Sequence, residues 1–294
     1  MEFERIAYMK FRKLLAAGLA ACSLLTLAAC KSDDGETDWN QYRQSDGALD
    51  SVKTENGGTL TFESVDSDTV KITGYRGPDT LHQVVIPATV RTSEDTSIAP
   101  KKVAVIGIRA FHSLSALEEV VLPEGLTTVE DFAFTECRQL KKVTFPSTLE
   151  TIGNAAFEGC VKLTDIGTLS GSKVAALPQQ CFAECTALTS VTVPGTVKTV
   201  GRGAFFGCTG LTEVVLEEGV EELTEQCFMN AEKLATLTLP ATLKNTDPAA
   251  DLNFCGDLKL TTVNVPAGAP ESVTAYKTDL LEYIQNLIEA ETKA

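Results

Sequence analysis

Six segments of this chain repeat one another with a nearly constant period. The repeats are separated by 23, 23, 25, 23 and 23 residues and begin at Leu117, Leu140, Leu163, Leu188, Leu211 and Leu234. A fixed period of this length is typical of a solenoid, in which each repeat forms one coil. One coil cannot bury its apolar edge alone, so neighbouring coils must stack to make a core.

Equivalent positions of the repeats carry the same kinds of residue. Each repeat opens with the pattern L-x-x-V-x-L or a close variant, as in Leu211, Val214 and Leu216. From the middle apolar residue onward, apolar and polar residues alternate, which predicts a short strand with one buried face. Proline suits the end of such a strand because it donates no backbone hydrogen bond. These prolines are Pro123, Pro146, Pro194 and Pro240. Further inward columns are an apolar pair, a phenylalanine (Phe111, Phe134, Phe157, Phe182, Phe205, Phe228) and, three residues later, a small apolar residue.

That last column holds four cysteines: Cys137, Cys160, Cys185 and Cys208. Stacked neighbours lie about 4.8 Å apart with parallel side chains. A disulfide needs Cβ atoms closer together and converging, so we expect buried free thiols. Cys181 and Cys227 occupy a different column, two coils apart, and are too far from each other to pair.

The two ends of the repeat array differ from its middle. Residues 57–108 are expected to form an N-terminal cap and an atypical first repeat, with a β-hairpin over 57–76 that covers the open end. The repeats themselves span 109–266, with a bulge expected around Gly167–Ser172. Residues 267–294 are expected to form a C-terminal helical cap, helical over 273–290 and capped by Ser272.

The N-terminal residues resemble a targeting segment rather than part of the fold. Lys10, Arg12 and Lys13 precede an apolar run that ends at Leu27-Ala28-Ala29-Cys30. This order resembles a bacterial lipobox and implies a lipoprotein signal peptide over 1–29 and lipidation of Cys30. An ordinary secretory signal is the alternative. Residues 30–56 are polar and are expected to be a flexible tether.

The repeat columns resemble the BspA-like branch of the leucine-rich repeats, whose pattern is L-T-x-V-x-I-P-x-x-V-x-x-I-G-x-x-A-F-x-x-C. Residues 188–210 match it nearly throughout, including Gly201, Ala204, Phe205 and Cys208. The resemblance implies a mostly β leucine-rich-repeat solenoid with an N-terminal β-hairpin cap and a C-terminal helical cap. It also implies a surface protein of the kind that binds host matrix proteins or other cells.

Composition argues against several classes of function. The net charge of −15 makes nucleic acid an unlikely partner and leaves the lipid anchor as the expected route to the membrane. His82 and His112 are the two histidines, too few for a zinc site, and Gly201-x-Gly203 lacks the third glycine of a dinucleotide fingerprint. A glutamate run from Glu213 to Glu225 is more typical of a solvated face than of a calcium site. We therefore expect neither an enzyme nor a bound cofactor or metal.

The outward positions of the first strand in each repeat are the best candidates for ligand contact. They are Glu119, Val121, Lys142, Thr144, Asp165, Gly167, Ser190, Thr192, Glu213, Val215, Thr236 and Thr238. Such a flat, mildly polar surface suits protein or glycan contact better than catalysis, which needs a concave pocket. The leading hypothesis is adhesion to a protein at the bacterial outer membrane or cell surface. Glycan capture for nutrient uptake is the alternative, and a face with no ligand is also consistent with the pattern.

Overall fold

The computed structural model describes residues 50–54, 58–77, 82–93, 95–244, 253–254, 256 and 259–292. The described residues up to Ile288 belong to one compact unit. The expected signal peptide, Cys30 and most of the expected tether lie outside the described residues.

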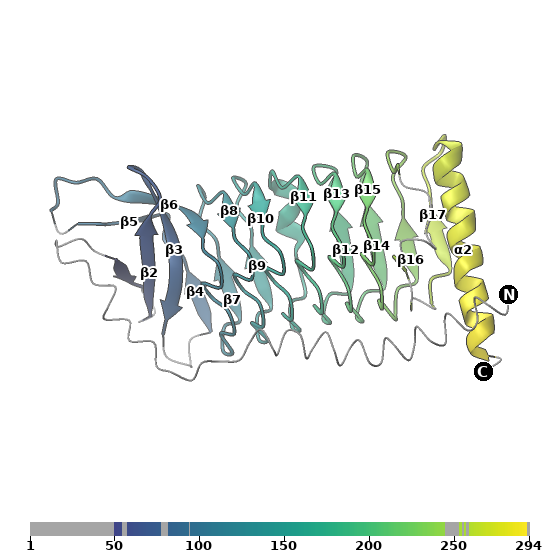
Figure 1. Ribbon diagram of the computed structural model, residues 1–294, viewed down its shortest axis with the longest axis horizontal. Helices are drawn as coiled ribbons and strands as arrows, with labels where there is room; N and C mark the ends of the chain where they lie inside the picture. Colours follow the sequence, from purple (N-terminus) through teal and green to yellow (C-terminus); the bar gives the residue numbers. More distant parts are fainter. Residues whose placement is uncertain are drawn as a thin grey trace. The chain divides into compact units, whose positions relative to one another are not determined.

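Parallel strands, one from each of most coils, form one side of this unit, which we call the strand-side face (Figure 1). A three-stranded sheet contains β4 (Gln83–Val85), β7 (Glu119–Val121) and β9 (Lys142–Thr144). A four-stranded sheet contains β12 (Ser190–Val193), β14 (Glu213–Leu216), β16 (Thr236–Thr238) and β17 (Thr262–Asn264). Residues at the same repeat position pair with each other, and their middle apolar residues are buried. The predicted solenoid is therefore confirmed.

A second set of strands, which the sequence did not predict, lies after the first strand of most repeats. They are β8 (Thr128–Val129), β10 (Thr151–Ile152), β11 (Ala176–Leu177), β13 (Thr199–Val200) and β15 (Glu222–Leu223). Each pairs in parallel with a neighbouring coil. The apolar pairs expected to point inward, such as Leu149 and Ile152, are buried here.

The phenylalanine column forms a continuous stack through the core. From Phe111 to Phe228, neighbouring ring centroids lie 4.9 to 5.6 Å apart and nearly parallel. The stack is longer than predicted, because Tyr75 continues it at one end and Phe254 at the other, at 6.0 and 5.6 Å. All the phenylalanines of the stack are fully buried, so the column is the centre of the hydrophobic core.

Backbone hydrogen bonds join the coils at this column as well. The amides of Phe134, Phe157 and Phe182 donate to carbonyls of the following coil, those of Ala156, Cys181 and Ala204, over 2.8 to 2.9 Å. Each turn reaches this geometry through two left-handed residues, as at Phe132 (φ 58°) and Glu136 (φ 61°). The buried amides are therefore satisfied outside any sheet.

The predicted thiol column is confirmed. Cys137, Cys160, Cys185 and Cys208 are buried free thiols, and so is Cys181. Each thiol of the column donates to a phenylalanine carbonyl of the preceding coil over 3.0 to 3.3 Å. Burial raises the pKa of Cys137 and Cys208 to about 12, which keeps both thiols protonated.

The N-terminal end is closed by β-structure. The predicted hairpin is confirmed: it consists of β2 (Thr59–Ser64) and β3 (Thr69–Arg76), which pair antiparallel and bury Leu60 and Ile72. β3 then pairs in parallel with β6 (Lys101–Ile106), which also pairs with β5 (Thr89–Val90) and β8. The structure adds β1 (Ser51–Lys53), which pairs with β2 in a segment expected to belong to the tether.

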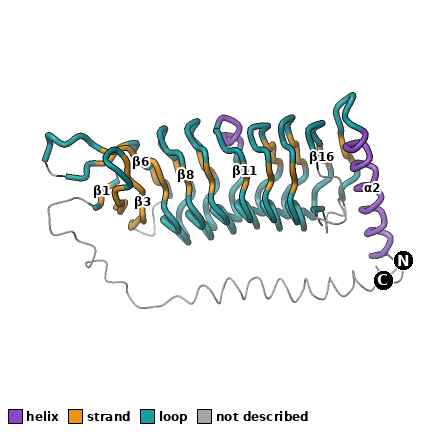
Figure 2. Tube along the Cα trace, turned by 45° about the horizontal axis from the view of Figure 1, so that its top comes forward, coloured by secondary structure: helices purple, strands orange, loops and turns teal. Residues whose placement is uncertain are grey.

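The C-terminal end is closed by α2 (Glu271–Thr292), which lies beside β17 in both views (Figures 1 and 2). Its apolar face is buried through Val273, Tyr276, Leu280, Ile284 and Leu287. These residues recur at helical spacing within the segment predicted to be helical, 273–290. The helix begins before Ser272, so the expected cap is wrong: Ser272 lies in the first turn.

The expected bulge in the 25-residue repeat is also wrong. The repeat accommodates its two extra residues by forming a five-residue 3-10 helix, η2 (Gly167–Gly171), instead. Ile166 and Leu169 are buried in the core around this helix, and an isolated bridge between Lys142 and Asp165 is the remaining pairing on that side. The strand-side face is consequently split into two sheets at this coil.

Candidate ligand-binding face

The outward side chains of the strand-side face form two rows, as expected, but in two blocks separated by η2. The N-terminal block consists of Gln83, Val85, Glu119, Val121, Lys142 and Thr144. The C-terminal block consists of Ser190, Thr192, Glu213, Val215, Thr236, Thr238, Thr262 and Asn264. The repeat pattern predicted ten of these positions. It left out Gln83, Val85, Thr262 and Asn264, which the pairing of β4 and β17 adds.

Charged and polar groups of the N-terminal block contact one another across the strands. Glu119 accepts a hydrogen bond from Gln83 Nε2 at 3.1 Å and forms an ion pair with Lys142 at 3.7 Å. Just before these strands, Glu118 contacts His82 at 3.3 Å and Lys141 at 2.6 Å. The hydrogen bond from Lys141 lowers the pKa of Glu118. These exposed pairs contribute little stability each, but they fix where the charges lie.

An apolar strip lies between these charges and the corner of the coil. Val85 is 47% exposed and pairs in register with Val121, which in turn pairs with Thr144. The block therefore offers apolar surface beside one pair of opposite charges, Glu119 and Lys142. This combination is common at protein interfaces, where charge sets orientation and association rate.

The C-terminal block has a different chemistry. Its eight side chains include five hydroxyls, and Glu213 is its one charged residue. Asn264 Nδ2 donates to the hydroxyl of Thr238 at 3.4 Å. Across the part of the chain that the structure describes, no hydrogen bond engages the hydroxyls of Ser190, Thr192, Thr236 or Thr262. The block thus keeps hydrogen-bonding capacity that its own neighbours do not use.

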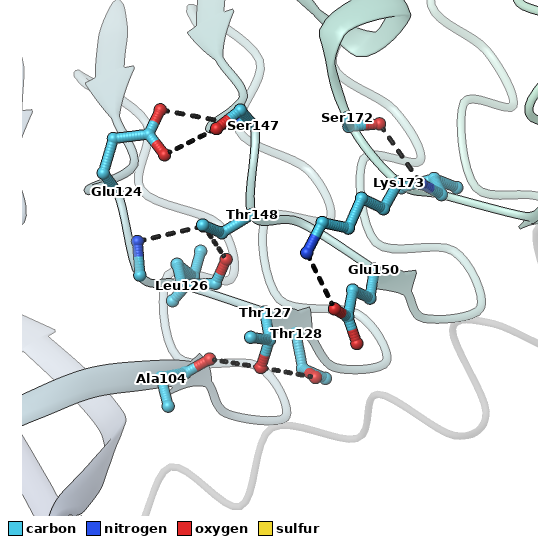
Figure 3. Close-up of polar contacts among 12 residues, drawn as sticks. Ala104, Glu124, Leu126, Thr127, Thr128, Ser147, Thr148, Glu150, Ser172 and Lys173 are labelled. Carbon is cyan, nitrogen blue, oxygen red and sulfur yellow. Dashed lines mark hydrogen bonds and ion pairs between the residues drawn. The ribbon is translucent and has the colours of Figure 1, made fainter.

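The corner beside the face is held by side chains that bridge adjacent coils (Figure 3). Glu124 accepts from the amide and the hydroxyl of Ser147 at 3.1 and 2.9 Å. Thr148 accepts from the amide of Gly125 and donates to the carbonyl of Leu126, at 2.9 and 2.7 Å. Thr242 repeats this bridge with Gly219 and Val220. These contacts fix the register of the strands that carry the face.

The glutamate run that begins at Glu213 is not a cluster in space. Glu218 accepts from the amide of Ala241 at 2.8 Å, Glu221 contacts Lys198 and Lys244, and Glu225 pairs with Arg202 at 3.6 Å. These residues lie at different positions around one coil. Within the described ranges, no group of three or more His, Cys, Asp or Glu is arranged to hold a metal ion.

One titratable group, Glu158, was not singled out by the sequence. Burial, together with the nearby charges of Glu184 and Glu136, raises its pKa to about 7. Glu158 follows Phe157 in the turn after β10, and it is not part of the strand-side face. Repeat position alone could not have found it, because the equivalent residue of the next coil is Ala183.

A family model described as "BspA type Leucine rich repeat region" matches residues 88–175 and 175–290, in six copies. This match covers more than half of the chain. The chain belongs to the BspA-type leucine-rich repeat family. Its repeats are thus of a bacterial surface-protein type, and its fold is the one that the family resemblance implied.

Solved structures of bacterial leucine-rich repeat proteins are similar to this chain. The T. pallidum leucine-rich repeat protein TpLRR is 24% identical over 70% of this chain and 78% of that one, with a TM-score of 0.46. A leucine-rich cell surface protein from Faecalibacterium prausnitzii is 18% identical over 77% and 97%, with a TM-score of 0.36. The pneumococcal vaccine antigen PcpA is 17% identical over 73% and 77%, with a TM-score of 0.41. No curated protein matches the chain.

Among the described residues, no helix is long and apolar enough to cross a membrane.

Proposed function

We propose that this protein is a cell-surface binding module that adheres to a protein partner through the N-terminal block of its strand-side face. The supporting observation is the strip of Val85 and Val121 beside the cross-strand pair of Glu119 and Lys142. Apolar contact supplies affinity at such a surface, and the charges select the partner and its orientation. The proposal is for a non-catalytic protein, with no cofactor.

Adhesion can be measured with cells that display the full chain on plates coated with extracellular-matrix proteins. We expect attachment to at least one of these proteins. The variant Glu119→Lys/Lys142→Glu should lose it, because both signs of charge are exchanged at fixed positions. Glu222→Lys, on the second set of strands, is the matched control and should attach like the wild type. Failure of the wild type to attach, or equal attachment by the double variant, would refute the proposal.

We further propose that a lipid on Cys30 holds the protein at the outer membrane or cell surface. The support is the order of basic flank, apolar run, small residues and cysteine in the sequence. Labelling of growing cells with a fatty acid should mark the wild type and leave Cys30→Ala unmarked. Cys22→Ala should be marked like the wild type. Equal labelling of Cys30→Ala would exclude this anchor.

A further inference from the structure

We infer that the C-terminal block binds a neutral polysaccharide chain that lies across β12, β14, β16 and β17. This site goes beyond the proposed protein adhesion and uses a different part of the strand-side face. Its outward rows are Ser190, Glu213, Thr236 and Thr262, and Thr192, Val215, Thr238 and Asn264. Exposed threonines also stand just before β12 and β17, at Thr189 and Thr261, whereas the hydroxyl of Thr212, just before β14, donates to the carbonyl oxygen of Thr189 at 2.9 Å.

The charge distribution of the C-terminal block disfavours polyanions and polycations as ligands. Glu213 is its one ionised side chain, and no ion pair engages Glu213 within the described residues. A polyanion would meet this carboxylate and the net charge of −15 on the chain, without a lysine or arginine in the block to offset them. A polycation would find a single carboxylate, Glu213, among the eight positions of the block, which is too few for strong attraction. A neutral polymer therefore fits the charge of this block best.

A protein partner would find few anchors on the C-terminal block. Energetically dominant contacts at protein interfaces come mostly from tryptophan, tyrosine and arginine, whereas serine, threonine and valine are under-represented among them. Neither block contains a residue of the first group, but the N-terminal block carries the charge pair of Glu119 and Lys142, whereas the C-terminal block has one carboxylate among its eight positions. The C-terminal block therefore lacks the paired charges that would orient a protein partner.

The hydroxyls of the C-terminal block are placed to act together. The strands pair in register, so equivalent side chains repeat at about 4.8 Å along each row. One hydroxyl hydrogen bond contributes little net free energy, because each partner gives up water. Several contacts on a rigid sheet add to each other, since the sheet is already ordered before the ligand arrives. A chain of sugar units presents hydroxyls at a comparable repeat along its length.

Substitution of threonine by valine isolates the hydroxyl, because both residues are β-branched and favour strands. The test variant is Thr192→Val/Thr236→Val/Thr238→Val. Its matched control is Thr128→Val/Thr151→Val/Thr199→Val, which removes the same number of hydroxyls from the second set of strands. Size-exclusion chromatography and thermal unfolding of both variants check that the wild-type oligomeric state and fold are retained.

The measurement is the retardation of the purified full chain in native gels that contain mixed-linkage β-glucan, galactomannan or dextran, with heparin as a polyanion. We expect retardation by at least one neutral polymer and not by heparin, with little dependence on salt. The test variant should bind at least about tenfold more weakly, because three hydrogen-bonding groups are lost. The control variant should bind like the wild type.

Three results would overturn the inference: no retardation by any neutral polymer, equal retardation of the test variant, or retardation by heparin alone. The protein-adhesion proposal is tested separately, because Glu119→Lys/Lys142→Glu leaves the C-terminal block intact. That variant should keep its retardation by the polysaccharide even where it loses attachment to the coated plates.

Discussion

The thiol of Cys160 donates a hydrogen bond to the carbonyl oxygen of Phe134, 3.3 Å away in the preceding coil. The amide of the same phenylalanine donates forward to Ala156 at 2.8 Å. One buried peptide unit on each side of Phe134 is thus tied to the following coil, while its ring stacks at 5.2 Å on Phe157. Side-chain stacking and polar satisfaction therefore act at the same point of each coil.

Removing a ring from the middle of the stack should cost a large part of the stability. Phe157→Ala should lower the free energy of unfolding by about 3–5 kcal/mol, because Phe157 is fully buried between Phe134 and Phe182. Phe206→Ala, a half-buried neighbour of the stack, is the control and should cost clearly less. Urea unfolding followed by circular dichroism measures both. Similar losses for the two variants would contradict a stability centred on the stack.

The four buried thiols of the cysteine column should be unreactive in the folded protein. Burial raises the pKa of Cys208 to about 12, so the thiolate that reacts with iodoacetamide is scarce at neutral pH. Mass spectrometry should show alkylation of Cys137, Cys160, Cys185 and Cys208 only after unfolding in guanidinium. Ser190→Cys supplies an exposed thiol as a positive control. Rapid labelling of the column without denaturant would show that these cysteines are accessible.

Gly201 should not tolerate a side chain. A Cβ there would lie 2.5 Å from the carbonyl oxygen of Leu177 and 2.8 Å from the carbonyl carbon of Pro178, and this backbone cannot move aside freely. Gly201→Ala should therefore lower stability by about 1–3 kcal/mol. Gly171→Ala is the control, because a Cβ on Gly171 meets nothing within 4 Å. The pair can be compared by thermal unfolding, and equal melting temperatures would be inconsistent with the close approach at Gly201.

Glu158 should make the protein less stable as the pH rises. The pKa of Glu158 is raised to about 7 in the folded chain, whereas the pKa of a glutamate in an unfolded chain is about 4.3. Its stabilising contribution is therefore complete below the unfolded value and is lost as the pH rises through about 7. Glu158→Gln should equal the wild type near pH 4 and exceed its melting temperature at about pH 8.

The control for this pH dependence is Glu232→Gln, which changes an exposed carboxyl in a later coil. It should leave the wild-type pH profile of the melting temperature almost unchanged. A Glu158→Gln profile parallel to that of the wild type across the whole range would show that Glu158 does not hold its proton in the folded state.

The repeat pattern predicted the coils, the buried columns and most of the strand-side rows. It could do so because Phe157 and Cys160 recur at fixed spacing, and stacking places like residues together. It did not predict Tyr75 or Phe254 in the stack, since both lie where the period is broken. It also missed η2, because two additional residues at Gly167–Gly171 can be absorbed by a bulge or by a helical turn, and the burial of Leu169 decides between them.

The candidate site was predictable as a surface but not as two blocks. Equal spacing of the outward positions implied one continuous face from Glu119 to Thr238. Which polar groups engage each other depends on side-chain reach across strands, as between Gln83 and Glu119 at 3.1 Å, and a repeat alignment does not contain that information.

The hairpin and α2 close opposite ends of the unit, while the coils between them join one another in the same way. Deletion of Leu188–Gly210 would place Leu211 directly after Ala187 and leave strand, corner and turn in the same order in every remaining coil. The shortened chain should still fold, with its surface reduced by about 4.8 Å along the axis. The length of the ligand-binding face is therefore set by the number of coils that the gene encodes. Insertion or deletion of one repeat changes this length in a single genetic step.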